Sequence, residues 1–109
     1  MATEAIKVQL TAAVTNAESV VLTGVAGHSY AILSVLLCET AGNAETFDLY
    51  VDDNAGGTDY YIYKTQALGA NATFEHTSKG VIEGTDRLCA ALGSAGDVDV
   101  VVSYLAQTL

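Results

Sequence analysis

The sequence predicts an all-β protein, a single antiparallel β-sandwich that is jelly-roll-like and has about eight or nine short strands. Apolar and polar residues alternate along one segment after another, and a period of two is that of a half-buried strand. These segments recur about every ten residues between turns rich in Gly, Asn and Asp, as in sandwiches, jelly rolls and small barrels. A chain of 109 residues, 50% of them apolar, is long enough to form one domain over residues 1–109.

The first predicted strand covers residues 6–14, where Ile6, Val8 and Leu10 alternate with polar residues. Residues 1–5 before it are expected to form a flexible N-terminal arm. Because edge strands readily accept partners, this strand is a candidate for pairing with the sheet edge of a neighbouring subunit.

Two strands follow, at residues 19–25 and 29–40, separated by a Gly-rich turn. The second of them is almost continuously apolar, which favours a central strand covered on both faces.

The next two strands, residues 46–52 and 59–64, form a predicted hairpin around a loop of Asp, Asn and Gly. Closing the loop symmetrically places Asp52 opposite Asp59 and continues, one residue at a time, to Leu49 opposite Ile62 and Asp48 opposite Tyr63. In this register the face expected to point to the core carries Leu49, Val51, Tyr60 and Ile62. The opposite, outer face carries Asp48, Tyr50, Tyr61 and Tyr63.

The last predicted strands cover residues 72–77, 80–84, 86–92 and 97–105. The final one has the clearest alternation, and the residues expected to share its apolar face are Val98, Val100, Val102 and Tyr104.

The charge balance excludes some partners. Thirteen acids against four bases give a formal net charge of −9, which repels a phosphate backbone, so we expect no binding to nucleic acid. The longest apolar run, residues 30–38, is too short to span a bilayer, and an acid stands near the start where a secretory signal would carry positive charge. We therefore expect a soluble protein made in a cytoplasm, with no membrane partner.

Cysteine and acidic residues suggest no metal centre. Cys38 and Cys89 lie within predicted strands, and in a reducing compartment each is expected to be a small buried hydrophobe and not half of a disulfide. The acidic loop at residues 52–57 fails the EF-hand pattern, because the position of the required Glu is taken by Tyr or Lys. An irregular cation site at Asp52 and Asp59 remains the alternative to a hydrated turn.

No catalytic motif is found. His28 and His76 are the two histidines, and neither belongs to a recognisable nucleophile motif or to a phosphate-binding glycine loop. We expect no enzymatic activity and no cofactor; a pocket gathering either histidine with carboxylates would be the sign of an enzyme.

Tyrosine is the unusual residue of this chain, with six copies and no Trp. Tyr50, Tyr61 and Tyr63, with Asp48, form the predicted outer face of the hairpin. A large apolar ring with a polar tip suits a surface that becomes buried against a partner, so these residues are the candidate oligomer or partner interface. Ordinary cross-strand packing and a sugar-binding platform are the alternatives.

Three segments give the chain a resemblance to a known class. They are residues 25–35 (VAGHSYAILSV), 39–52 (ETAGNAETFDLYVD) and 80–91 (GVIEGTDRLCAA), followed by the valine-rich terminal strand around Ser103 and Tyr104. In this order they resemble the small β-sandwich virion proteins of tailed bacteriophages. The chain departs from that pattern at Ala26, where a Pro is usual.

The resemblance implies a non-enzymatic virion protein that decorates or cements the head shell, or that forms part of the tail or head–tail connector. It also implies a homo-oligomer, with a trimer favoured, bound to the major capsid protein or to another virion protein. A carbohydrate-binding module using the same tyrosines is the alternative from another class.

Overall fold

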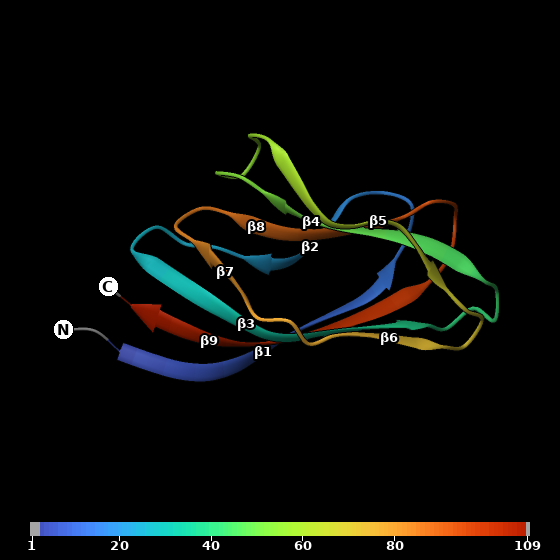
Figure 1. Ribbon diagram of the computed structural model, residues 1–109, viewed down its shortest axis with the longest axis horizontal. Coiled ribbons are helices and arrows are strands. Elements are labelled where there is room, and N and C mark those ends of the chain that lie inside the picture. The colour runs from blue at the N-terminus through green and yellow to red at the C-terminus, as the bar shows by residue number, and fades with distance from the viewer. Residues whose placement is uncertain (1–2, 109) are drawn as a thin grey trace.

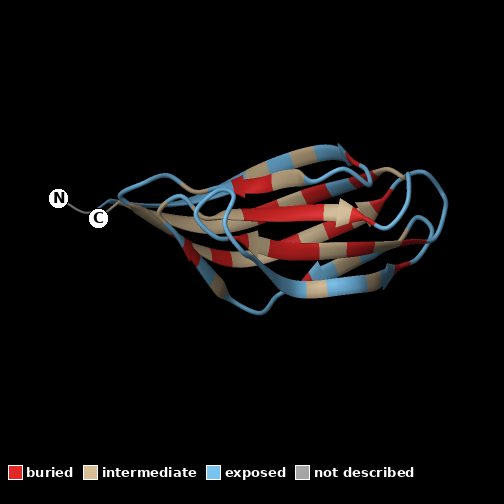
Figure 2. Cartoon of the chain, turned by 90° about the horizontal axis from the view of Figure 1, so that it is seen from above, coloured by how far each residue is buried: buried red, intermediate tan, exposed pale blue. Residues whose placement is uncertain are grey.

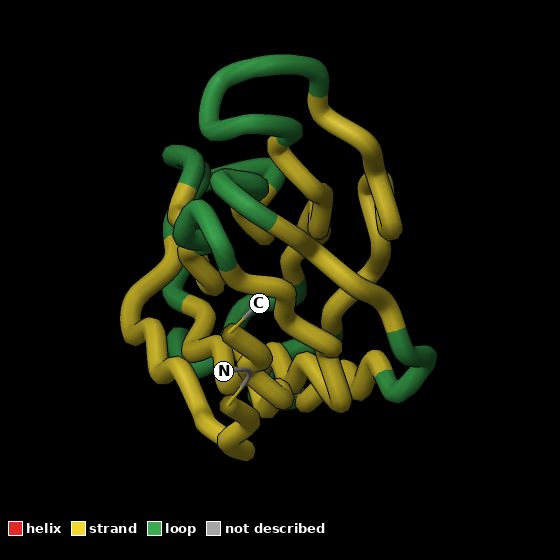
Figure 3. The backbone as a smooth tube through the Cα atoms, turned by 90° about the vertical axis from the view of Figure 1, so that its left-hand side faces the viewer, coloured by secondary structure: helices red, strands yellow, loops and turns green. Residues whose placement is uncertain are grey.

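The computed structural model describes residues 3–108, and this range contains nine strands and no helix (Figure 3). Each predicted strand has its counterpart. The strands are β1 (Thr3–Val14), β2 (Ser19–Thr23), β3 (His28–Glu39), β4 (Glu45–Asp52), β5 (Asp59–Leu68), β6 (Thr73–His76), β7 (Gly80–Glu83), β8 (Arg87–Leu92) and β9 (Val98–Thr108).

The strands form two stacked antiparallel sheets (Figure 1). One sheet has the order β1-β9-β3-β6, with β7 also paired to β3, and the other has the order β2-β8-β4-β5. Two connections stay within one sheet: the β4–β5 hairpin, and the connection between β6 and β7, which both pair with β3. Every other connection crosses from one sheet to the other. This is the strand order of a jelly roll, so the predicted fold class is confirmed.

The core lies between the two sheets and is made of aliphatic side chains around one phenylalanine. Figure 2 shows the buried segments along the middle of the strands and the exposed ones at the edges and loops. The largest fully buried side chains include Phe47, Leu22, Leu37, Leu49, Ile82 and Leu88. The face predicted for the last strand is confirmed, because Val98, Val100 and Val102 are buried and Tyr104 packs against the core.

Strand β1 directs its alternating apolar residues to the outside. The alternating residues Ile6, Val8 and Leu10 point away from the core and are 77%, 53% and 71% exposed. Residues of the other set, such as Lys7, lie opposite inward-facing residues of β9. The alternation located the strand, but a period of two does not say which of its faces the second sheet covers.

The two ends of the described chain lie side by side, since β1 and β9 pair antiparallel from Thr3 opposite Thr108 (Figure 1). Residues 3–5 of the expected arm belong to β1, whereas residues 1–2 lie outside the described range. Among the described residues, no helix long and apolar enough to cross a membrane is found.

Candidate assembly surfaces and the end pocket

The β4–β5 hairpin follows the predicted register only near its loop. Asp52 lies opposite Asp59 and Tyr50 opposite Tyr61 as expected, but Leu49 then lies opposite Tyr63. Ile62 is therefore an extra residue, a β-bulge, and it reverses the face of the β5 residues that follow it. A second register shift, between Leu49 and Phe47, restores the alternation from Gln66 to the end of the strand. The predicted pairs Leu49–Ile62 and Asp48–Tyr63 are wrong for this reason.

The bulge separates the three tyrosines that were expected to share one face. Tyr61 is 46% exposed and its ring lies 5.0 Å from that of Tyr50, measured between centroids. Tyr50 is buried, and its hydroxyl donates a hydrogen bond to the carboxylate of Glu18. Burial and this carboxylate raise the pKa of Tyr50 well above its ordinary value.

Tyr63 points inward. Its ring packs edge-on against Phe47 and Phe74, and its hydroxyl is hydrogen-bonded to Nδ1 of His76 at 2.9 Å. His76 is itself buried. Tyr63 and His76 are thus hydrogen-bonded partners beside the aromatic part of the core. This hydrogen bond and the packing of the rings explain why both residues are here without a functional role.

The outer side of the hairpin keeps Asp48, which lies 3.8 Å from Nζ of Lys64 and accepts a hydrogen bond from the backbone N–H of Thr65. Lys64 lies 4.3 Å from the ring centroid of Tyr61. Two residues expected in the core are exposed at this edge of the sheet, Tyr60 at 59% and Ile62 at 40%. The expectation that they are buried in the core is wrong, because Ile62 is the extra residue of the bulge and Tyr60 lies on the edge strand next to the hairpin loop.

Asp52 does not offer a cation site. Its carboxylate accepts hydrogen bonds from the guanidinium of Arg87 and from the backbone N–H of Gly56. The Arg87 hydrogen bond lowers the pKa of Asp52 against the opposing effect of burial. Burial, followed by the charge of Asp52, raises the pKa of Asp59.

One group of acid and thiol atoms does come together, at Glu18, Asp52 and Cys89, whose candidate ligand atoms lie within 4.8 Å of one another. Arg87 already contacts both carboxylates, at 3.8 Å for Glu18. Burial, and then the charge of Glu18, raise the pKa of the Cys89 thiol to about 12, so sulfur is protonated here. The group is an ion-paired cluster beside β8, in which Asp52 and Cys89 are buried. Cys38 and Cys89 are both free cysteines; Cys89 is buried as predicted, whereas Cys38 is only half-buried.

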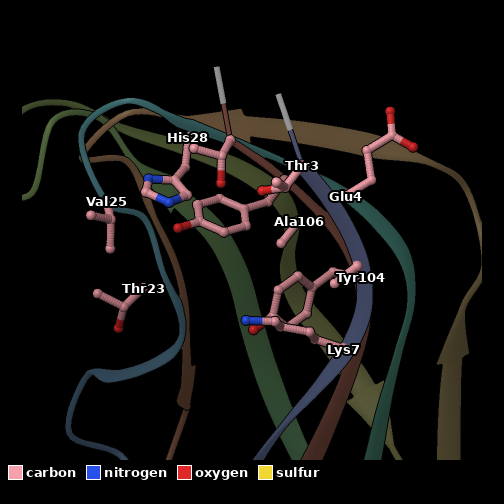
Figure 4. A pocket seen from close by; sticks show the side chains of 11 residues that line it. Thr3, Glu4, Lys7, Thr23, Val25, His28, Tyr104 and Ala106 are labelled. Carbon is pink, nitrogen blue, oxygen red and sulfur yellow. The ribbon is translucent and has the colours of Figure 1, made fainter. Parts of the chain in front are cut away.

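A pocket of about 430 Å³ opens at the end of the sandwich where the chain ends meet (Figure 4). Figure 4 shows Thr23 and Val25 on one side, Lys7 and Tyr104 on the other, and His28 at the top. Of the two histidines, His28 lines this pocket, but its Nδ1–H donates to the carbonyl of Ala26. The carboxylate of Glu4, also at the pocket, accepts a hydrogen bond from Gln107.

The feature that the sequence analysis missed is the outer apolar face. We give this name to Ile6, Val8 and Leu10 of β1 with their neighbours Leu105 and Val101 of β9 and Leu36 of β3. The pairing places them on the side of the five-stranded sheet that faces away from the core. Individual exposed apolar residues are common, but a contiguous group on one sheet face marks an interaction surface.

The fold and these surfaces define the class: a jelly-roll protein with an apolar sheet face directed to the outside. Among solved structures, the chain is similar to one from "Bacillus endospore appendages form a novel family of disulfide-linked pili". The TM-score is 0.56 at 11% identity, covering 98% of this chain and 87% of that one. It is also similar to a chain in the acidic stable capsid structure of Helicobacter pylori bacteriophage KHP30, with a TM-score of 0.55 at 16% identity and coverage of 97% and 92%.

At these identities the two likenesses show the fold alone. A xylan-binding domain of Paenibacillus barcinonensis covers 98% of the chain and 85% of its own, at 14% identity and a TM-score of 0.42, too low to support an argument. The sequence matches no protein-family model and no curated protein. This protein is therefore a jelly-roll chain that is similar in size and fold to a chain from a pilus and to a chain of a phage capsid.

Proposed function

We propose that this protein is a non-enzymatic structural protein of a tailed bacteriophage virion, a decoration or cement protein of the capsid. It binds the outside of the head shell as a homo-oligomer, with a trimer favoured, and stabilises the shell. Its partners are other copies of itself and the major capsid protein or another virion protein. It is assembled into the virion in the cytoplasm of the host bacterium.

The observation that carries this proposal is the outer apolar face on a chain of net charge −9. Negative charge keeps many copies soluble before assembly. The exposed side chains of Ile6 and Leu10 favour binding, because covering them with another protein removes apolar surface from water. The likeness to a chain of a phage capsid over nearly its whole length agrees with this use of the fold. The resemblance in three sequence segments points to the same class.

The direct test is binding to head shells. Purified protein is mixed with shells from which the native copy has been removed, the mixture is sedimented, and bound protein is located by gold-labelled antibody. We expect binding to the shell exterior and a higher temperature of shell disruption. Label confined to tails or necks would support the alternative of a tail or connector component, and no binding to any virion part would reject the proposal.

The alternative of a carbohydrate-binding module has one specific observation in its favour, the end pocket, where Tyr104 and His28 stand beside hydroxyl groups and Lys7. The hairpin does not offer the predicted platform, since Tyr50 and Tyr63 are engaged inside the protein. A glycan array separates the two readings. Binding that disappears in Tyr104→Ala, or in Tyr61→Ala at the hairpin, would favour the carbohydrate reading.

A further inference from the structure

We propose that copies of this chain associate through the outer apolar face, and not through the tyrosine hairpin. The occupant of the face is a second copy of the chain. This inference deepens the proposed function and rests on its homo-oligomer, for which it names the contact surface.

The first support is the degree of exposure along β1. Ile6 and Leu10 are more than two thirds exposed and Val8 is half exposed, although all three are branched aliphatic residues in the middle of a strand. Their partners on β9 are Leu105, Ser103 and Val101, so the stripe continues across the next strand, where these residues are half-buried. Covering such side chains gains about 25 cal/mol per Å² of apolar surface.

The second support is the distribution of charge. Between Ile6 and Leu10, the outward residues of β1, β9 and β3 carry no charge. Acidic side chains border this block, with Glu4 at one end, Asp99 at the other and Glu75 on β6 beside Leu36. Two copies of net charge −9 repel each other, and an uncharged centre with a charged rim is the arrangement that lets them approach.

The third support is size. The described molecule measures 47 × 26 × 20 Å, and Figure 1, a view along the shortest axis, shows the two sheets one above the other. This side of the molecule therefore measures at most 47 by 20 Å. A specific interface buries about 800 Å² on each partner, so the outer apolar face together with its polar surroundings on this side gives room for one copy to contact another.

The fourth support is the position of β1. It pairs only with β9 and forms the edge of its sheet, so its other backbone edge is open along the same residues that carry the stripe. A copy packed over the outer apolar face beside this edge also shields these unpaired backbone groups from solvent. At the hairpin, by contrast, Tyr50 and Tyr63 have internal hydrogen-bond partners and leave mainly Tyr60 and Tyr61 to a partner.

The experiment measures molar mass by sedimentation equilibrium for the wild type, for Val8→Glu and for the double variant Ile6→Thr with Leu10→Thr. The matched control is Tyr60→Thr, which removes an equally exposed apolar side chain from the other sheet. Because these side chains are exposed in the single chain, the variants are expected to keep the wild-type near-ultraviolet circular dichroism. Hydrogen exchange along β1 gives a second measurement.

We expect the wild type and Tyr60→Thr to be oligomers of the same mass, and both β1 variants to dissociate at least tenfold more readily. The amides of β1 should exchange faster in the dissociated form. A wild type that stays monomeric, β1 variants that keep the wild-type mass, or dissociation by Tyr60→Thr would overturn the inference. If the wild type is a monomer and Val8→Glu loses shell binding, the face contacts the shell; the shell-binding part of the proposed function then stands, while its homo-oligomer and this inference fail.

Discussion

At the scale of single residues, Glu39 has the most demanding position in the molecule. It is fully buried at the end of β3, and its carboxylate accepts backbone hydrogen bonds from Ala41, Gly42, Asn43 and Asn71 at 2.8 to 3.1 Å. Burial raises the pKa of Glu39, but the four donors outweigh burial and lower it below its ordinary value of 4.5. One side chain thus fixes two loops that are far apart in sequence.

We predict that Glu39→Gln lowers the urea midpoint at neutral pH, because a neutral amide accepts these hydrogen bonds more weakly than a carboxylate. The folded-state pKa lies below the unfolded one, so the stabilisation is complete above about pH 4.5 and is lost as pH falls through the folded pKa. The difference between the two proteins should therefore be large at pH 7 and shrink at pH 3. Glu75→Gln, at an exposed site, is the control, and a difference that grows in acid would contradict the prediction.

A second residue-scale prediction concerns the ion pair of Arg87 with Asp52. Arg87→Gln leaves a buried carboxylate without its cation, so the thermal midpoint should fall, and Asp52→Asn in the same chain should recover part of the loss. Calcium added to the wild type should leave the midpoint unchanged, since Arg87 already neutralises this group. A calcium-dependent rise would show that the acidic loop binds cations after all.

At the scale of elements, the bulge at Ile62 determines what the β4–β5 hairpin presents to each side. It turns Tyr63 toward Phe47 and leaves Tyr61 outside. Without the extra residue, Leu49 would still lie opposite Tyr63 and Tyr50 opposite Tyr61, as they do now. Ile62 can therefore be deleted without a change in the pairs on either side of it.

We predict that deleting Ile62 gives a folded protein with a thermal midpoint near that of the wild type and with the Tyr63–His76 hydrogen bond retained. Deleting Val101 instead, where β9 pairs with β1 and β3 without a break, shifts the rest of β9 by one residue and turns the buried Val102 outward, so that variant should be strongly destabilised. Equal effects of the two deletions on the melting curve would show that register is not the reason.

The aromatic cluster allows a prediction with a magnitude. Phe47 is fully buried and contacts both Tyr63 and Phe74 within 6.0 Å between ring centroids. Phe47→Ala should lower the free energy of unfolding by about 3–5 kcal/mol, measured by urea titration. Tyr60→Ala, at the exposed edge, should change it by about 0.5 kcal/mol or less in the single chain. A loss of under about 1 kcal/mol at Phe47 would mean that the cluster collapses around the space.

These elements also show how far sequence alone reaches. Alternation located every strand. It also gave the correct face of β9, because Val98, Val100 and Val102 share one face with no charged residue between them. It could not give the face of β1, since the choice depends on which side the second sheet covers. The bulge at Ile62 has no local signal in this sequence, and it moved Tyr63 from the candidate interface to the core. The partners of Glu39 lie in two loops that only the tertiary fold brings together.

At the scale of the whole molecule, charge and apolar surface act against each other. Thirteen acids against four bases keep separate copies apart, while the outer apolar face draws them together. We predict that raising sodium chloride from about 10 mM to about 500 mM increases the oligomer fraction, because the Debye length falls from about 30 Å to a few Å. Sedimentation velocity at the two salt concentrations measures this, and Val8→Glu should remain dissociated at both. An oligomer that falls apart in salt would point to contacts made by ion pairs.

The pairing of Thr3 with Thr108 has a practical consequence. Cα atoms opposite each other in an antiparallel ladder are about 4.5–5.5 Å apart, so a linker of a few residues would close the chain into a ring. New termini cut into the acidic loop at residues 53–58 would then emerge at the tip of the β4–β5 hairpin. A circularly permuted protein of this kind would carry fused peptides at the tip of that hairpin and leave the β1–β9 ladder intact.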